Sequence, residues 1–277
     1  MAFSKKDINS IWERQIKLGK LSHAYLFVDP KKQNFNFVLD LLSKLVEDKI
    51  EDYHFFYLIQ EENGKKNILV DQLRTLQEEF QTTSSDLKIA LIKNAELLNE
   101  QASNSILKFI EEPAENQMIF LYANSVANIL PTINSRVQQI ILPELSVDEL
   151  VDEYSEFGLD PKYTYLLAQV AANKEIANEL QNDAWFFNVA TKVEQWIEML
   201  QNKNHDAFIF VEGILMKYLK TPLQQTTFPL IALNLLEQKS IENVNLLNIF
   251  VEELDKSKFN INMQTTLEKI AIRSFIS

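Results

Sequence analysis

The chain has 277 residues, 46% of them hydrophobic, which is enough for two or three domains with cores of their own. It contains no cysteine, which excludes disulfides, thiolate catalysis and sulfur-ligated zinc, and its three histidines are too widely spaced to suggest a metal site. The formal charge of −12 argues against DNA binding as the main role, and the lack of an apolar N-terminal stretch predicts a cytoplasmic protein that contacts no membrane.

The first half of the chain alternates between short apolar runs and amphipathic segments. A helix is predicted over residues 7–18, where Gly19 supplies a left-handed cap, and a buried strand over 24–28. Further strands are predicted at 55–59, 89–92, 118–122 and 137–142, and further helices at 35–46, 70–80 and 99–112. Strands that alternate with helices predict a parallel sheet covered by helices, and this unit is expected to close near residue 143.

Beyond residue 143 the pattern becomes helical throughout. Ser146 and Glu149 form a predicted capping box, and Asp160 followed by Pro161 predicts a second helix start. Apolar stripes with helical spacing are found at 184–200, 208–219, 244–254 and 263–275. We therefore predict a small helical domain over 144–183 and a helical bundle over 184–277.

The helix predicted from residue 184 is rich in aromatic side chains. Its buried stripe is expected to contain Phe186, Val189, Val193, Trp196 and Ile197. Trp185 and Phe187 fall outside this stripe. Both are therefore candidates for a contact with another subunit.

Three strings in the first domain resemble a known family. They are Leu21-Ser-His-Ala-Tyr-Leu-Phe27, Ala102-Ser-Asn-Ser-Ile-Leu-Lys-Phe-Ile-Glu-Glu-Pro113 and Leu130-Pro-Thr-Ile-Asn-Ser-Arg136. In order and spacing they resemble the nucleotide-binding strand, the A-x-N-x-L-L-K-x-x-E-E-P helix and the L-P-T-I-x-S-R-C motif of the clamp-loader family of AAA+ proteins. The resemblance implies an α/β plus all-α fold, with a RecA-like AAA+ parallel-sheet domain at 1–143, a small helical lid at 144–183 and a helical collar at 184–277.

The positions that handle nucleotide phosphates depart from the family's pattern. Residues 29–35 contain no glycine, although a phosphate loop needs glycines for its left-handed turns, and Asp29 brings an acid where phosphate would approach. Lys93-Asn-Ala-Glu96 stands where a hydrolysing relative carries Asp-Glu-Ala-Asp, and Glu175 stands where the family has a phosphate-contacting arginine. These departures imply that the chain neither binds nor hydrolyses ATP, needs no cofactor or metal and has no activity alone.

The Ser135-Arg136 pair of the third motif is retained, although Val137 replaces the family's usual cysteine. In the family this arginine reaches the γ-phosphate of ATP held by a neighbouring subunit. Such an arginine accelerates nucleotide hydrolysis by about 10³–10⁵ in general. The resemblance implies tau/gamma ATPase subunits and the delta subunit as partners, and loading of a sliding clamp on primer-template DNA as the activity of the complex.

The expected subunit interface on this domain contains Thr132, Glu111, Glu112 and Pro113. Acids at a helix C-terminus oppose the helix dipole, which suggests a cationic partner, but this end could also be an ordinary solvated terminus. Arg136 taken by position alone could be a surface arginine paired with a carboxylate.

Two alternatives for the whole chain and one local contact are left open by the sequence. It could be an ATP-hydrolysing subunit of the tau/gamma type with an unusual phosphate loop, or an inert scaffold without a trans-acting arginine. Lys31 and Lys32 could also make a local contact with DNA.

Overall fold

The computed structural model describes residues 3–46, 49–60, 67–81, 85–113, 116–238, 244–257 and 262–276. It divides into two compact units, Met1–Glu144 and Leu145–Ser277. The boundary between lid and collar near residue 183 stays a prediction. No helix within the described ranges combines the length and the hydropathy that a membrane crossing requires.

The first unit is built on a five-stranded sheet in which every neighbouring pair of strands is parallel. The strand order is β2-β3-β4-β1-β5. The strands are β1 Ala24–Val28, β2 Phe56–Ile59, β3 Lys88–Lys93, β4 Gln117–Ala123 and β5 Gln138–Ile141. The predicted parallel sheet is confirmed, with strand ends within one residue of the predicted ones.

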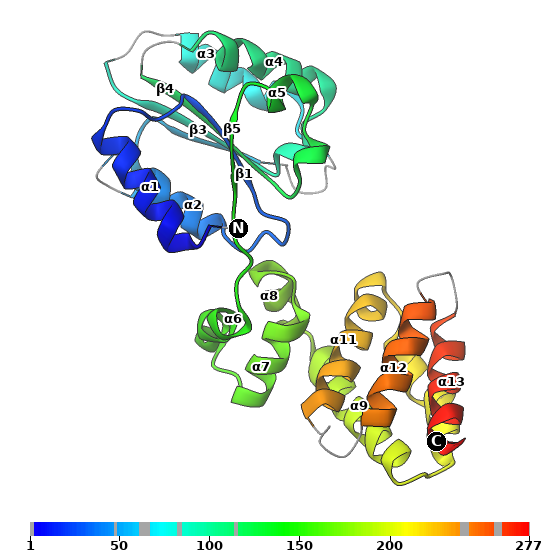
Figure 1. The fold of residues 1–277 in the computed structure, drawn as a ribbon. Helices are drawn as coiled ribbons and strands as arrows, with labels where there is room; N and C mark the ends of the chain where they lie inside the picture. The colour runs from blue at the N-terminus through cyan, green and yellow to red at the C-terminus, as the bar shows by residue number, and fades with distance from the viewer. Residues whose placement is uncertain are drawn as a thin grey trace. The chain divides into compact units, whose positions relative to one another are not determined.

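Helices cover both faces of this sheet (Figure 1). On one face lie α1 Lys5–Lys17 and α2 Phe35–Ser43, and on the other lie α3 Arg74–Gln81, α4 Glu100–Glu111 and α5 Pro131–Asn134. Short 3-10 helices connect the layers: η1 Ile50–Asp52, η2 Val70–Leu73, η3 Ala95–Leu97 and η4 Val126–Asn128.

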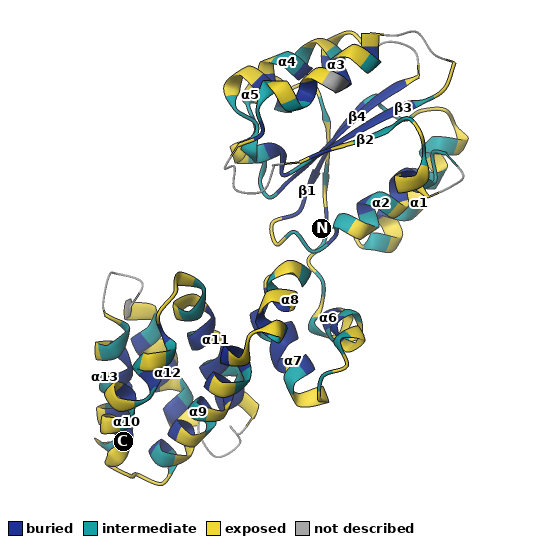
Figure 2. Cartoon of the chain, turned by 180° about the vertical axis from the view of Figure 1, so that it is seen from behind, coloured by how far each residue is buried: buried dark blue, intermediate teal, exposed yellow. Residues whose placement is uncertain are grey.

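The alternation of side chains along β1 explains its continuous apolar sequence. Tyr25 and Phe27 pack with Trp12 of α1 in one core cluster, whereas Leu26 packs with Ile106 of α4 in the cluster on the opposite face. All five residues of β1 are buried, as the dark strands of Figure 2 show. A central parallel strand is covered on both faces, so it contains no polar position.

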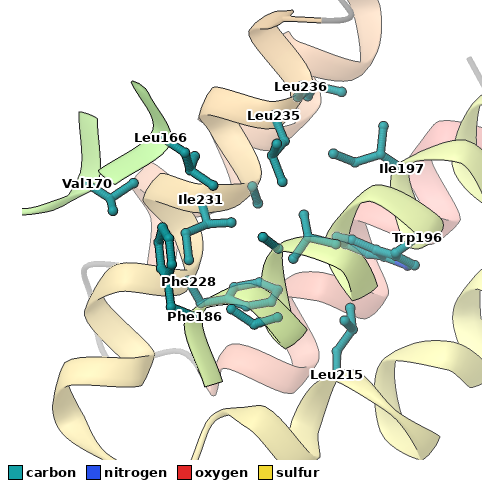
Figure 3. Packing of buried hydrophobic residues seen from close by; sticks show 14 of the residues in the cluster. Leu166, Val170, Phe186, Trp196, Ile197, Leu215, Phe228, Ile231, Leu235 and Leu236 are labelled. Atoms are coloured by element: carbon teal, nitrogen blue, oxygen red, sulfur yellow. The ribbon is translucent and has the colours of Figure 1, made fainter. Parts of the chain in front are cut away.

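The second unit is wholly helical in its described part. Its elements are α6 Val147–Tyr154, η5 Ser155–Phe157, α7 Pro161–Val170, α8 Lys174–Asn182, α9 Ala184–Gln201, α10 Asp206–Gly213, η6 Leu215–Tyr218, α11 Pro222–Gln238, α12 Val244–Ser257 and α13 Met263–Ile276. The predicted capping box is present, because Ser146 Oγ accepts the Glu149 N–H and the Glu149 carboxylate accepts the Ser146 N–H. One hydrophobic cluster runs through the whole unit, and Figure 3 shows Leu166 of α7 beside Ile231 of α11 and Phe186 of α9.

Two details of this unit differ from the sequence prediction. The helix expected over 208–219 is divided into α10 and η6, which separate after Gly213. Helix α11 was not predicted as an element. Pro229 lies in its interior, although proline normally ends a helix. Its buried residues, among them Phe228, Ile231 and Leu235, hold it in place despite the proline.

Candidate functional site

The loop that follows β1 occupies the position of a phosphate loop, and the chain fills it with its own carboxylate. Asp29 is 1% exposed. Its Oδ2 accepts the backbone N–H of Asn34 at 2.6 Å, the Tyr122 hydroxyl at 2.6 Å and the Asn34 side-chain amide at 3.2 Å. Asn34 is the N-cap of α2, so one of the N–H groups that an anion would use at this helix end is already donated to Asp29.

The second lysine of the loop is bound to the segment that follows β3. Lys32 Nζ lies 2.9 Å from Glu96 Oε1 and 2.5 Å from Asn94 Oδ1, and the Glu96 side chain is only 7% exposed. Lys32 and Asn94 both have left-handed backbones, with φ of 55° and 54°. The chain therefore makes left-handed turns without glycine. These turns lie in the loop after β1 and in the segment after β3, which Lys32 connects through its contacts with Glu96 and Asn94.

A magnesium-bound triphosphate does not fit these residues. It would bring negative charge against the buried carboxylate of Asp29, which burial leaves without solvent screening. The cation that would contact the phosphates, Lys32, is paired with Glu96. Lys31 pairs with Glu144 at 2.7 Å, so both lysines considered for a DNA contact have acidic partners. Glu175 is exposed in the first turn of α8, in the second unit.

Arg136 lies at the end of a firmly anchored turn. Helix α5 starts with Pro131 at its first position and buries Ile133, which is 1% exposed. Asn134 Nδ2 donates to the carbonyls of Val126 at 2.9 Å and Ile129 at 3.1 Å. The Arg136 N–H donates to Ile133 O at 2.9 Å, so the backbone that carries the guanidinium is fixed on both sides.

The guanidinium of Arg136 is held by three contacts and is exposed to solvent. Its Nε lies 2.8 Å from Glu111 Oε1, and its Nη1 donates to Thr132 O at 2.9 Å and to Ser135 Oγ at 3.0 Å. The side chain is 41% exposed. Within the described residues Nη2 has no acceptor, so two of the five N–H donors of the fork have no partner there.

Four of the predicted site residues thus lie together: Glu111, Thr132, Ser135 and Arg136. A cationic partner was expected for the acidic end of α4. For Glu111 this partner is Arg136 of the same chain. Glu112 is the C-cap of α4, and both it and Pro113 are exposed. The ion pair of an ordinary surface arginine is present, and so is the exposed fork that a trans-acting arginine requires.

The arginine and the loop lie at opposite edges of the sheet. In the parallel register Tyr25 pairs with Gln138, so Arg136 lies beyond the amino end of β1, whereas Asp29 follows its carboxyl end. The five residues of β1 at about 3.3 Å each separate the two by about 17 Å. No arginine side chain spans this distance, so Arg136 cannot serve a nucleotide in its own chain's loop.

The two aromatic residues predicted as subunit contacts lie in the second unit. The placement of one of them outside the buried stripe was wrong, and the subunit contacts themselves stay predictions. Trp185 was placed outside the buried stripe of α9, but it is 8% exposed and its Nε1 donates to Tyr218 O at 2.6 Å. It belongs to the core. Phe187 is half-buried and packs edge-on against Tyr163, with ring centroids 5.0 Å apart.

Comparisons with known proteins agree with the motifs. The family model described as DNA polymerase III, delta subunit, matches residues 4–146. DNA polymerase III subunit delta-prime of Bacillus subtilis is 30% identical over 251 residues, which are 81% of this chain and 76% of the relative. The subunit of the same name from Pseudomonas aeruginosa is 34% identical over 91 residues, 32% of this chain and 27% of the relative.

A solved structure supports the fold. The gamma subunit-related protein of Thermotoga maritima has a TM-score of 0.50 at 17% identity, over 96% of this chain and 98% of that one. At this identity the likeness establishes the architecture alone, which is an AAA+ parallel sheet followed by helices.

Proposed function

Because the chain belongs to the DNA polymerase III delta-prime family of AAA+ clamp-loader proteins, we propose that it lends Arg136 to ATP bound by a neighbouring subunit and binds no ATP itself. Family membership implies other clamp-loader subunits as partners. In this proposal they are the tau/gamma ATPase subunits and the delta subunit, and the complex loads a sliding clamp on primer-template DNA in the cytoplasm. Residues 144–183 act as the lid and 184–277 as the collar, where Phe187 is a candidate contact.

The exposed fork of Arg136 is the observation that carries the proposal. Its backbone is anchored, its side chain is 41% exposed, and Nη2 has no acceptor in the described part of the chain. Charge grows on the γ-phosphate oxygens during phosphoryl transfer, and a fixed guanidinium stabilises that charge without further reorganisation. The separation of about 17 Å from the chain's own loop supports a role of this arginine at a nucleotide in another subunit.

The experiment is reconstitution of the complex with Arg136→Ala and Arg136→Lys. We expect both variants to assemble and both to lose turnover at the ATP site that Arg136 serves, with a parallel loss of clamp loading. Lysine restores the charge but not the planar fork, so it should rescue poorly. Arg74→Ala is the matched control, because Arg74 is also an exposed arginine of the first unit paired with a glutamate, Glu78, at 3.6 Å.

Two results would favour the alternatives. Normal ATP turnover in assembled complexes that contain Arg136→Ala would support an inert scaffold. Tight binding of a fluorescent ATP analogue with magnesium by the isolated chain would support an ATPase of the tau/gamma type. We expect no such binding, because Asp29 already accepts the Asn34 N–H and Glu96 already pairs with Lys32, the two groups that would otherwise contact the phosphates.

A further inference from the structure

We infer that Glu111 is a positioning residue for Arg136, which fixes the plane of the guanidinium so that Nη2 faces the neighbouring subunit. This inference rests on the proposed function. Glu111 Oε1 forms an ion pair with Arg136 and lies 2.8 Å from Nε, while the carbonyl of Thr132 and the hydroxyl of Ser135 accept hydrogen bonds from Nη1. The carboxylate beside Nε and the two acceptors on Nη1 together fix the plane of the fork and leave the two protons of Nη2 for a phosphate.

The carboxylate can act in this way because the end of α4 is itself fixed. Asn99 caps the start of the helix by accepting the Ala102 N–H at 2.7 Å, and Ile110, next to Glu111, is 2% exposed. The Ile110 carbonyl lies 2.7 Å from His23 Nε2, at the start of β1. Glu111 therefore projects from a helix end that is tied to the residue preceding β1.

Glu111 lies where the helix dipole disfavours a negative charge, and Arg136 offsets this unfavourable interaction. A carboxylate in the last turn of a helix is unfavourable beside the negative end of the dipole. Arg136 removes this penalty, and the pair joins α4 to the turn after α5. Both side chains are more than a third exposed, at 41% and 44%, so the pair contributes little to overall stability and its main effect is on orientation.

Glu111 could also slow the reaction instead of supporting it, so the direction of the rate change on its removal tests the inference. A carboxylate beside Arg136 could compete with the phosphate and restrain the rate. The geometry favours positioning, because Glu111 binds Nε and leaves Nη2 unoccupied within the described residues. Removal of Glu111 should therefore slow the reaction.

The experiment measures ATP turnover of the reconstituted complex with Glu111→Ala and Glu111→Gln, each with Arg136 and with Arg136→Ala. In the Arg136 background we expect Glu111→Ala to lower kcat about two- to fivefold, as for an exposed pair, with KM for ATP unchanged. Glu111→Gln keeps an oxygen acceptor and should recover most of the rate. With Arg136→Ala, loss of Glu111 should have no further effect.

Glu78→Ala is the matched control, because it removes another exposed glutamate that pairs with an arginine of the same unit. It should leave kcat unchanged. A slow Arg136→Ala complex with an unchanged or faster Glu111→Ala complex overturns the positioning role alone. An equal loss from Glu111→Ala in both backgrounds also overturns it, since Glu111 would then act by another route. Normal turnover with Arg136→Ala overturns the proposed function and this inference together.

Discussion

Replacing Tyr122 with phenylalanine tests whether the buried carboxylate of Asp29 holds the loop after β1 in its observed form. The Tyr122 hydroxyl and the Asn34 N–H each donate to Asp29 Oδ2 at 2.6 Å, and all three residues are buried. The substitution removes one donor and keeps the ring, which packs edge-on against Phe35 at 5.3 Å. A hydrogen bond to a carboxylate contributes about 1.5–3 kcal/mol, so we expect the first unit to lose about 2 kcal/mol.

Hydrogen exchange measured by mass spectrometry resolves this loss within one unit. Peptides that span β1 and β4 should exchange about 30-fold faster, because about 1.4 kcal/mol is a factor of ten. Peptides from α9 and α11 should not change and serve as the internal reference. Tyr57→Phe is the matched control: its hydroxyl donates to Glu79 at 3.2 Å at a half-buried position, so the loss should stay below about 1 kcal/mol. Unchanged exchange in β1 and β4 of Tyr122→Phe would refute the role assigned to Asp29.

Two further predictions concern the second unit. Hydrogen bonds from Lys256 and from Arg273 outweigh the effect of burial and hold the pKa of Glu253 below its ordinary value of 4.5. The ionised Glu253 therefore stabilises the fold above pH 4.5, and this stabilisation is lost as the pH falls through the lowered pKa. The urea midpoint of wild-type unfolding should decrease over that pH range. Glu253→Gln should remove the share of this decrease that comes from Glu253. Trp185→Phe should destabilise the unit by about 1 kcal/mol in urea unfolding, since it leaves the Tyr218 carbonyl without its indole donor.

The sequence predicts most of the first unit because its strands are covered on both faces. Such strands read as continuous apolar runs, and β1 and β4 are fully buried along their lengths. The helical unit is less predictable, because a helix that is packed on several sides does not show a single apolar stripe. Helix α9 packs against α8, α10, α11, η6 and α13, so its buried surface is wider than one stripe, and Trp185 turns inward toward Tyr218.

The motifs locate the site residues, but they do not say which residues meet. Glu111 and Arg136 are each visible in a family string, and their ion pair depends on the contact between α4 and α5. Likewise 93 residues separate Tyr122 from Asp29. A signal was available in this case, because the carboxyl ends of neighbouring parallel strands lie at one edge of a sheet, and β4 is the neighbour of β1.

The strand order also explains how a chain can lose a nucleotide site, as we propose for this one, and keep its arginine. Asp29, Tyr122 and the Lys32–Glu96 pair all lie where β1, β4 and β3 end, at the carboxyl edge of the sheet. Arg136 precedes β5, at the amino edge, and its contacts come from α4 and α5. No hydrogen bond or ion pair joins the two groups within the described residues. Substitutions that filled the loop with a carboxylate could therefore accumulate without moving the guanidinium, and the amino edge, which in our proposal faces a neighbour's ATP, would keep its geometry.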